Sequence, residues 1–164
     1  MPFHRRRFDV QPSSHCGVML ASDGRQDFSA RAVARAAALA GSDTVAVVTI
    51  AKIYGTSLGL PHPGLLPTND ELAERRGWVN GAIGTLAQSG ASADGQVAAT
   101  RRAGKKLAAV ARARGARVVV IDETTVKRGL RRVVEGDVGL ELRRMLQKDG
   151  IDVEVIPQED EAAA

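Results

Sequence analysis

Residues with the potential to bind a phosphate lie between positions 118 and 142. The apolar run Val118–Ile121 is followed at once by Asp122 and Glu123, and Gly136 precedes a helical pattern. A strand, a loop and a helix start in this order form the phosphate site of α/β nucleotide pockets. Glycines there let backbone N–H groups approach the phosphate oxygens, and the helix N-terminus adds positive partial charge. In this loop, Gly129 is the only glycine before Gly136. The segment therefore has the arrangement of a phosphate site without its chemistry.

A third carboxylate, Asp137, stands directly before the helical pattern. We interpret it as the helix cap, which stabilises the helix by about 1 kcal/mol and uses N–H groups that a phosphate would need. A like-charge pair about 4 Å apart costs roughly 4 kcal/mol at an effective dielectric of about 20, which weakens binding about a thousandfold. Four basic side chains in the loop either clamp an anion without glycines or form a solvated face. They are Lys127, Arg128, Arg131 and Arg132. Nucleotide binding in a non-standard form therefore stays open.

Other carboxylates offer less specific chemistry. Asp23 follows an apolar run and precedes Gly24, so it either makes a turn and caps the next helix or faces a ligand at the carboxyl edge of the sheet. Several carboxylates meeting in one cleft would be oxygen ligands for Mg²⁺ or Ca²⁺. The candidates are Asp23, Asp122, Glu123 and Asp137. We assign no metal site to them, because only topology suggests that they converge.

No residue pattern predicts catalysis. His4 and His15 lie in the polar N-terminal stretch, and His62, between two prolines, belongs to a stiff exposed turn or to a lid. The sequence contains neither Gly-x-Ser-x-Gly nor His-Glu-x-x-His. Cys16 is the only cysteine, so an internal disulfide and a cysteine-based zinc site are impossible. Its sequence neighbours would not lower its pKa, and we interpret it as a small buried hydrophobe.

Composition and charge narrow the remaining possibilities. Of the 164 residues 44% are hydrophobic and 3% aromatic, so we expect one domain with a core of Val, Leu, Ile and Ala. The chain has 23 Lys and Arg residues and 19 Asp and Glu residues, which gives a net charge of +4. A basic leader, 1–15, and an acidic tail, 158–164, are predicted to be disordered around a domain at 16–157. The sequence has no apolar secretory core, no aromatic platform and no run of about 18 apolar residues. We therefore expect a cytoplasmic protein that binds neither nucleic acid nor a membrane.

Short apolar runs alternate with helical patterns, which predicts βαβ units and a parallel sheet covered on both faces. Strands are expected at 17–22, 44–50, 96–100, 118–121 and 153–156, and helices at 29–40, 69–88, 104–114 and 137–148. Thr68 and Glu71 form a capping-box pattern at the start of the second helix. In the third helix we expect an apolar inner face and an outer basic face. The inner residues are Leu107, Val110 and Ala111, and the outer ones are Lys105, Lys106, Arg112 and Arg114.

These elements and four short motifs resemble the universal stress protein family. The motifs are an apolar strand ending in Asp-Gly, a helix of the form Ser-x-x-Ala-x-x-x-Ala-x-x-Leu-Ala, a helix ending in Ala-x-x-x-Gly-Ala, and Gly-Leu followed by a later Gly. The matching residues are Asp23, Gly24, Ser29, Ala32, Ala36, Leu39, Ala40, Ala111, Gly115, Ala116, Gly129, Leu130 and Gly136. Each motif alone is weak, but their order and spacing agree from about Cys16 to Pro157.

The resemblance implies a Rossmann-like three-layer α/β fold with five parallel strands in the order 3-2-1-4-5, and a homodimer formed along the last strand. It also implies that Asp23 faces the adenosine of a nucleotide and that the backbone near Thr49 and Ile50 lines the base. Family members that hold ATP carry Gly-x2-Gly-x9-Gly-(Ser/Thr) after the fourth strand. Here Gly136 is the third glycine, followed by Asp137.

The first two family glycines are absent under either possible alignment. They fall at Asp122 and Thr125 when the strand is aligned, and at Glu123 and Val126 when Gly136 is aligned. We therefore expect a non-enzymatic stress-response or interaction module without a cofactor, with an unknown protein partner and a degenerate nucleotide site formed by Asp23, Ile50, Gly136 and Asp137. The alternative is a module that binds ATP with Mg²⁺, or cyclic AMP, through the basic loop. An enzyme of unrelated chemistry on the same scaffold remains a third class.

Overall fold

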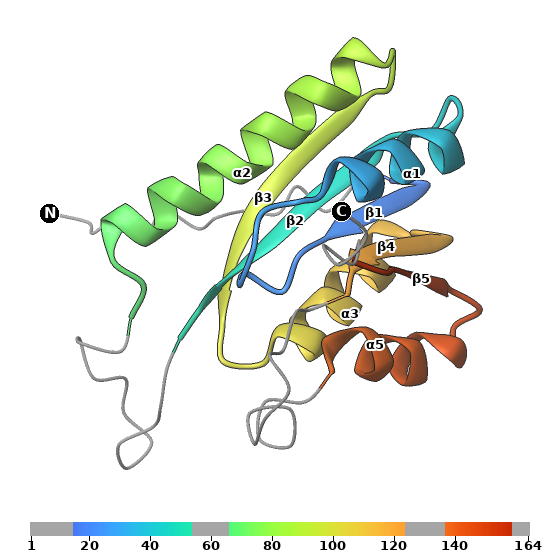
Figure 1. The fold of residues 1–164 in the computed structure, drawn as a ribbon. Coiled ribbons are helices and arrows are strands. Elements are labelled where there is room, and N and C mark those ends of the chain that lie inside the picture. The colour runs from blue at the N-terminus through green and yellow to red at the C-terminus, as the bar shows by residue number, and fades with distance from the viewer. Residues whose placement is uncertain (1–14, 54–65, 124–136, 159–164) are drawn as a thin grey trace, which may run out of the picture.

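The computed structural model describes residues 15–53, 66–123 and 137–158. It contains a five-stranded parallel sheet in the order β3-β2-β1-β4-β5, which confirms the expected fold class and strand order (Figure 1). The strands are β1 (Val18–Ala21), β2 (Val45–Lys52), β3 (Ala93–Thr100), β4 (Val118–Asp122) and β5 (Asp152–Ile156). The helices are α1 (Ala30–Ala40), α2 (Asn69–Gln88), α3 (Ala103–Arg114) and α5 (Val138–Gln147). The predicted leader up to residue 14, the basic loop with Gly136, and the tail from residue 159 lie outside the described residues.

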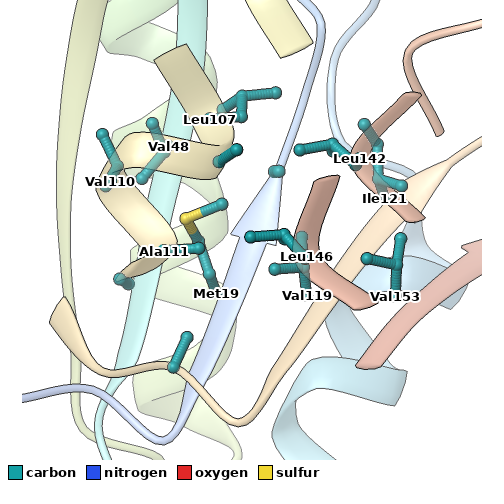
Figure 2. Packing of buried hydrophobic residues seen from close by; sticks show 14 of the residues in the cluster. Met19, Val48, Leu107, Val110, Ala111, Val119, Ile121, Leu142, Leu146 and Val153 are labelled. Atoms are coloured by element: carbon teal, nitrogen blue, oxygen red, sulfur yellow. The ribbon is translucent and has the colours of Figure 1, made fainter. Parts of the chain in front are cut away.

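Helices cover both faces of the sheet. Helices α1 and α2 lie on one face, and α3 and α5 lie on the other (Figure 1). On the second face, Met19, Val48 and Val119 pack among Leu107, Leu142 and Leu146 (Figure 2). A second apolar cluster lies between the sheet and the first pair of helices. Because β1 and most of β4 are buried from both sides, their apolar residues are continuous rather than alternating. None of the helices in the described ranges combines the length and apolarity needed to cross a bilayer.

Local capping sets the helix ends close to the predicted positions. The Ser29 hydroxyl accepts a hydrogen bond from the Ala32 N–H at 3.1 Å and caps α1. Thr68 and Glu71 form the complete capping box expected for α2, whose bounds match the prediction at both ends. Gly115, in the left-handed conformation, ends α3. These caps satisfy N–H and C=O groups that a helix leaves unpaired at its ends.

Strand β3 begins three residues earlier than the predicted strand at 96–100. Ala93, Asp94 and Gly95 have low strand propensity, which explains the prediction. In the fold they pair in register with the first residues of β2, and the pairing continues to Lys52 and Thr100. The long apolar neighbour therefore determines the length of β3, and local propensity does not.

Arg114 was predicted on the outer face of α3, and this prediction is wrong. Its side chain is only 7% exposed and forms two hydrogen bonds to the Asp94 carboxylate, one of them 2.6 Å long. The hydrogen bond to Asp94 raises the pKa of Arg114 above its ordinary value, although burial opposes this. The last turn of α3 points Arg114 toward the start of β3, which the helical spacing alone does not reveal. Lys105, Lys106 and Arg112 are exposed as expected.

Helix α2 contains three exposed glycines whose replacement should stabilise the protein. A Cβ atom built at Gly77, Gly81 or Gly84 meets no atom within 4 Å. Alanine loses less backbone entropy in a helix, so we expect Gly81→Ala to raise the free energy of unfolding by about 1 kcal/mol. Urea denaturation measures the change. The control is Gly95→Ala in β3, where the added Cβ would lie 2.3 Å from Val79 Cγ1 and should destabilise. A loss of stability in Gly81→Ala would contradict the helical geometry.

Candidate functional site

The candidate nucleotide site lies at the carboxyl edge of the sheet, where β1 and β4 are neighbours. From β1, the next two strands are added on one side of the sheet, and β4 and β5 are added on the other side. Open α/β sheets commonly bind ligands where this strand order reverses. The β1–α1 loop brings Asp23 to this edge, and β4 brings Asp122. Asp137 begins α5 on the other face. Gly136 belongs to the predicted site but lies outside the described residues.

The Asp122 carboxylate binds the N-terminal end of α1. Oδ2 accepts a hydrogen bond from the Ser29 N–H at 2.9 Å, and Oδ1 accepts one from the Ser29 hydroxyl at 2.5 Å. The same hydroxyl caps α1 by accepting from Ala32 N–H. A carboxylate at this position is favourable because the helix N-terminus carries positive partial charge. Asp122 therefore accepts hydrogen bonds from both the N–H and the hydroxyl of Ser29 at the carboxyl edge of the sheet.

The bond between Asp122 and Ser29 was not predicted from the sequence. The signal was nevertheless present, because Asp122 ends the fourth strand and Ser29 begins the first helix. Adjacent β1 and β4 place these two positions at one edge of the sheet. Combining the strand order with the identity of the last strand residue would have indicated the contact.

The Asp23-Gly24 turn lies against the end of β2. The Asp23 side chain is buried and accepts a hydrogen bond from the Arg25 N–H at 3.0 Å. Gly24 has φ of +88°, and its N–H donates to the Ser22 hydroxyl at 3.1 Å. A Cβ at Gly24 would lie only 2.0 Å from the Ile50 carbonyl oxygen. The turn thus packs directly on Ile50, a predicted site residue that is fully buried. The cap of α1 is Ser29, so the capping role considered for Asp23 is wrong.

Two glutamine side chains, Gln26 and Gln158, connect this turn with the ends of β4 and β5. Gln26 Nε2 donates to the Glu123 carbonyl oxygen at 3.2 Å. Gln158 Nε2, just after β5, is within 3.1 Å of both that carbonyl and Gln26 Oε1. The Arg31 guanidinium also donates to the Pro157 carbonyl at 3.0 Å. These bonds tie the β1–α1 loop to the ends of β4 and β5.

Asp137 is the N-cap of α5, as expected. Its carboxylate accepts a hydrogen bond from the Leu140 N–H at 3.3 Å, and its carbonyl accepts from the Glu141 N–H at 3.0 Å. The Asp137 side chain therefore satisfies one of the N–H groups that the first turn of α5 leaves unpaired. Asp137 is exposed and lies at the N-terminal end of α5, the end of a helix that attracts anions.

Among the described residues, the remaining buried polar groups near the sheet are Cys16 and Thr49. Cys16 is completely buried, and burial raises the pKa of its thiol, so it is protonated and inaccessible at neutral pH. The buried Thr49 hydroxyl has no hydrogen-bond partner among the residues that the structure describes. Within residues 15–53, 66–123 and 137–158, no group of three or more His, Cys, Asp or Glu side chains is placed to hold a metal ion.

Comparisons with known proteins identify the architecture. No protein-family model and no curated protein sequence matches the chain. Among solved structures, the universal stress protein from Archaeoglobus fulgidus has a TM-score of 0.61 at 17% identity, over 87% of this chain and 94% of that one. A universal stress protein in complex with cAMP has a TM-score of 0.61 at 18% identity, over 90% of this chain and 100% of that one.

A third similar structure is the Archaeoglobus fulgidus universal stress protein in complex with dAMP. Its TM-score is 0.56 at 17% identity, and the match covers 88% of this chain and 99% of that one. Each match covers nearly the whole of both chains. It therefore includes the five-stranded sheet together with the helices on its two faces. The chain therefore has the fold of the universal stress proteins.

Proposed function

We propose that this chain is a universal stress protein of the non-enzymatic kind, a stress-response or interaction module with a degenerate nucleotide site and no bound cofactor. The observation that carries the proposal is the Asp122 carboxylate on the N-terminal end of α1, where it accepts two hydrogen bonds from Ser29. A nucleotide phosphate that approaches this end of α1 would meet the negative charge of Asp122. At about 4 Å, such a charge pair costs roughly 4 kcal/mol at an effective dielectric of about 20.

Two further contacts support the same proposal. Asp137 accepts a hydrogen bond from an N–H group in the first turn of α5, so the N-terminal ends of α1 and α5 each bind a carboxylate of the chain. The hydrogen bonds among Gln26, Glu123 and Gln158 connect the β1–α1 loop with the ends of β4 and β5 at the carboxyl edge of the sheet.

The alternative function is binding of an adenine nucleotide. It is favoured by the similar structures described as complexes with cAMP and dAMP. In this alternative the basic residues 127, 128, 131 and 132 hold the anion, with Mg²⁺ for ATP. They lie outside the described residues, so the alternative depends on the sequence and on the neighbours.

We also propose a homodimer through β5. This strand is at the edge of the sheet, paired on one side by β4. Edge strands expose N–H and C=O groups that can pair with a second chain. The cavity beside β5 has a volume of about 780 Å³ and is lined by Arg35, Arg117, Arg143 and Glu154 among others. Arg35 and Glu154 form an ion pair there with an N–O distance of 2.7 Å, so the chain itself neutralises part of the positive charge of the cavity lining.

Thermal unfolding with ATP, AMP and cyclic AMP, each with and without Mg²⁺, tests the proposed function. A ligand at 100 times its Kd adds about 2.7 kcal/mol, which raises Tm by a few degrees in a domain of this size. We expect no such rise. A reproducible rise with any of the three nucleotides would favour the alternative function.

A charge-removal variant tests the reason for the missing affinity. We expect Asp122→Gly combined with Asp137→Ser to gain a Tm rise with ATP, since it removes both carboxylates from the helix ends. Asp70→Ser, which removes an exposed acid from the first turn of α2, is the control and should gain nothing. If the double variant responds no more than the control, the carboxylates are not the obstacle.

A further inference from the structure

A groove lies between the end of β2 and the start of α3, apart from the candidate nucleotide site at β1 and β4. Its volume is about 580 Å³, and its apolar lining comes from Ile53, Leu66 and Ala109. Leu66 is 46% exposed, which makes it one of two large hydrophobic side chains that the described residues leave open to solvent. An exposed leucine in a groove costs solvation free energy unless something covers it.

Four cationic side chains surround the same groove. Arg101 and Arg102 precede α3, and Lys105 and Lys106 lie in its first turns. None of the four forms an ion pair with any described residue. Glu141 of α5 approaches this helix end where a Cβ on Gly104 would contact it, but it does not pair with the four cations. Among the residues that the structure describes, the four cations of the groove are therefore unpaired, and Glu141 is a carboxylate close to the same helix end.

These cations do not benefit the helix that carries them. Arg102 is the N-cap residue of α3 and makes no side-chain cap hydrogen bond, and the first turn contains no acidic residue. Positive charge at a helix N-terminus opposes the helix dipole, and Ser or Asp is the favoured cap. The stability of α3 consequently does not explain a basic residue at Arg102 or Lys105. Binding of an anionic partner would explain both.

We propose that this groove binds an acidic peptide segment of a partner protein, with an aliphatic side chain of that segment covering Leu66. This inference is independent of the nucleotide crevice. The described lining favours a peptide over nucleic acid, since its apolar residues are aliphatic and match an aliphatic side chain of a peptide rather than the flat face of a base. The acidic tail of this chain fits less well, because residues 159–164 contain no large apolar side chain.

Fluorescence anisotropy with labelled peptides tests the proposal on the full chain. The first probe is a 12-residue peptide of alternating Glu and Leu pairs, and the second is a Glu-only peptide of the same length. We expect the Glu/Leu peptide to bind more tightly, and Lys105→Glu combined with Lys106→Glu to weaken its binding about tenfold or more at low salt. Leu66→Ser should weaken binding of the Glu/Leu peptide and leave the Glu-only peptide unchanged.

Two features of the experiment separate lost binding from lost structure. The Lys105→Glu change places an acid in the first turn of α3, so the double variant should unfold at a higher temperature than the parent while binding more weakly. The control is Arg144→Glu combined with Lys148→Glu, which makes the same charge change on α5, away from the groove. At the same low salt concentration, it should weaken peptide binding much less than Lys105→Glu combined with Lys106→Glu does.

Four results would overturn the proposal. The first is equal weakening by the control variant, and the second is equal binding of the two peptides. The third is tighter binding of a thymidine 20-mer than of the Glu/Leu peptide, which would indicate a nucleic-acid surface. The fourth is strong peptide binding only after removal of residues 159–164, which would show that the tail of the chain occupies the groove.

Discussion

Gly24→Ala should destabilise the protein by about 3 kcal/mol or more, because it introduces backbone strain and a clash together. Gly24 adopts φ of +88°, a conformation that costs an L-residue about 1 to 2 kcal/mol. The added Cβ would also stand 2.0 Å from the Ile50 carbonyl oxygen, a backbone atom of a central strand that cannot move freely. The β1–α1 turn or the end of β2 must shift. Thermal unfolding should show a Tm lower by about 10 °C in a domain of this length.

Gly90→Ala is the matched control for this prediction. Gly90 has a similar φ of +80°, but a Cβ built there meets nothing within 4 Å. It should cost only the conformational part, about 1 to 2 kcal/mol. The difference between the two variants isolates the contact of Gly24 with Ile50. Equal losses of stability would show that the turn does not press on β2 as described.

Asp94→Ala should have the second largest effect, about 2 kcal/mol of lost stability. It removes the carboxylate that binds the buried guanidinium of Arg114, the only basic residue of α3 whose side chain is inside the fold. Removing one partner of a fully buried ion pair costs about 3 to 5 kcal/mol, since the remaining charge is desolvated without compensation. The Asp94 side chain is 46% exposed, so water can reach this pair and reduce the loss.

The ion pair between Arg112 and Asp149 supplies the control. It has the same chemistry and an N–O distance of 2.6 Å, but its side chains are 45% and 40% exposed. Asp149→Ala should cost less than about 1 kcal/mol, the usual range for surface pairs. Urea denaturation of both variants gives the comparison. If Asp94→Ala is no more harmful than Asp149→Ala, the burial of Arg114 does not contribute to stability.

The elements of the fold were predictable where local signals agree with tertiary packing. The ends of α2 followed from the capping box at Thr68 and Glu71, and the buried strands followed from continuous apolar runs. Predictions failed where a distant partner decides the outcome. Asp94 and Gly95 are poor strand formers that β2 recruits into β3, and Arg114 is turned inward by Asp94, twenty positions earlier.

The candidate site was predictable in position and only partly in chemistry. The cap formed by Asp137 followed from its place before a helical pattern. The hydrogen bonds from Ser29 to Asp122 and the link from Gln26 to Gln158 join residues far apart in sequence, and no local motif encodes them. Both depend on strand order, which the sequence indicated only through the family resemblance.

Equilibrium dialysis of the full, unmodified chain against labelled ATP with Mg²⁺ tests the central claim most directly, namely that the chain's own carboxylates exclude the triphosphate. We predict no saturable binding up to about 1 mM ATP, the concentration at which a Kd corresponds to about −4.1 kcal/mol. Saturable binding of one ATP per chain with a micromolar Kd would contradict the claim, because Asp122 on the end of α1 would then not close the site.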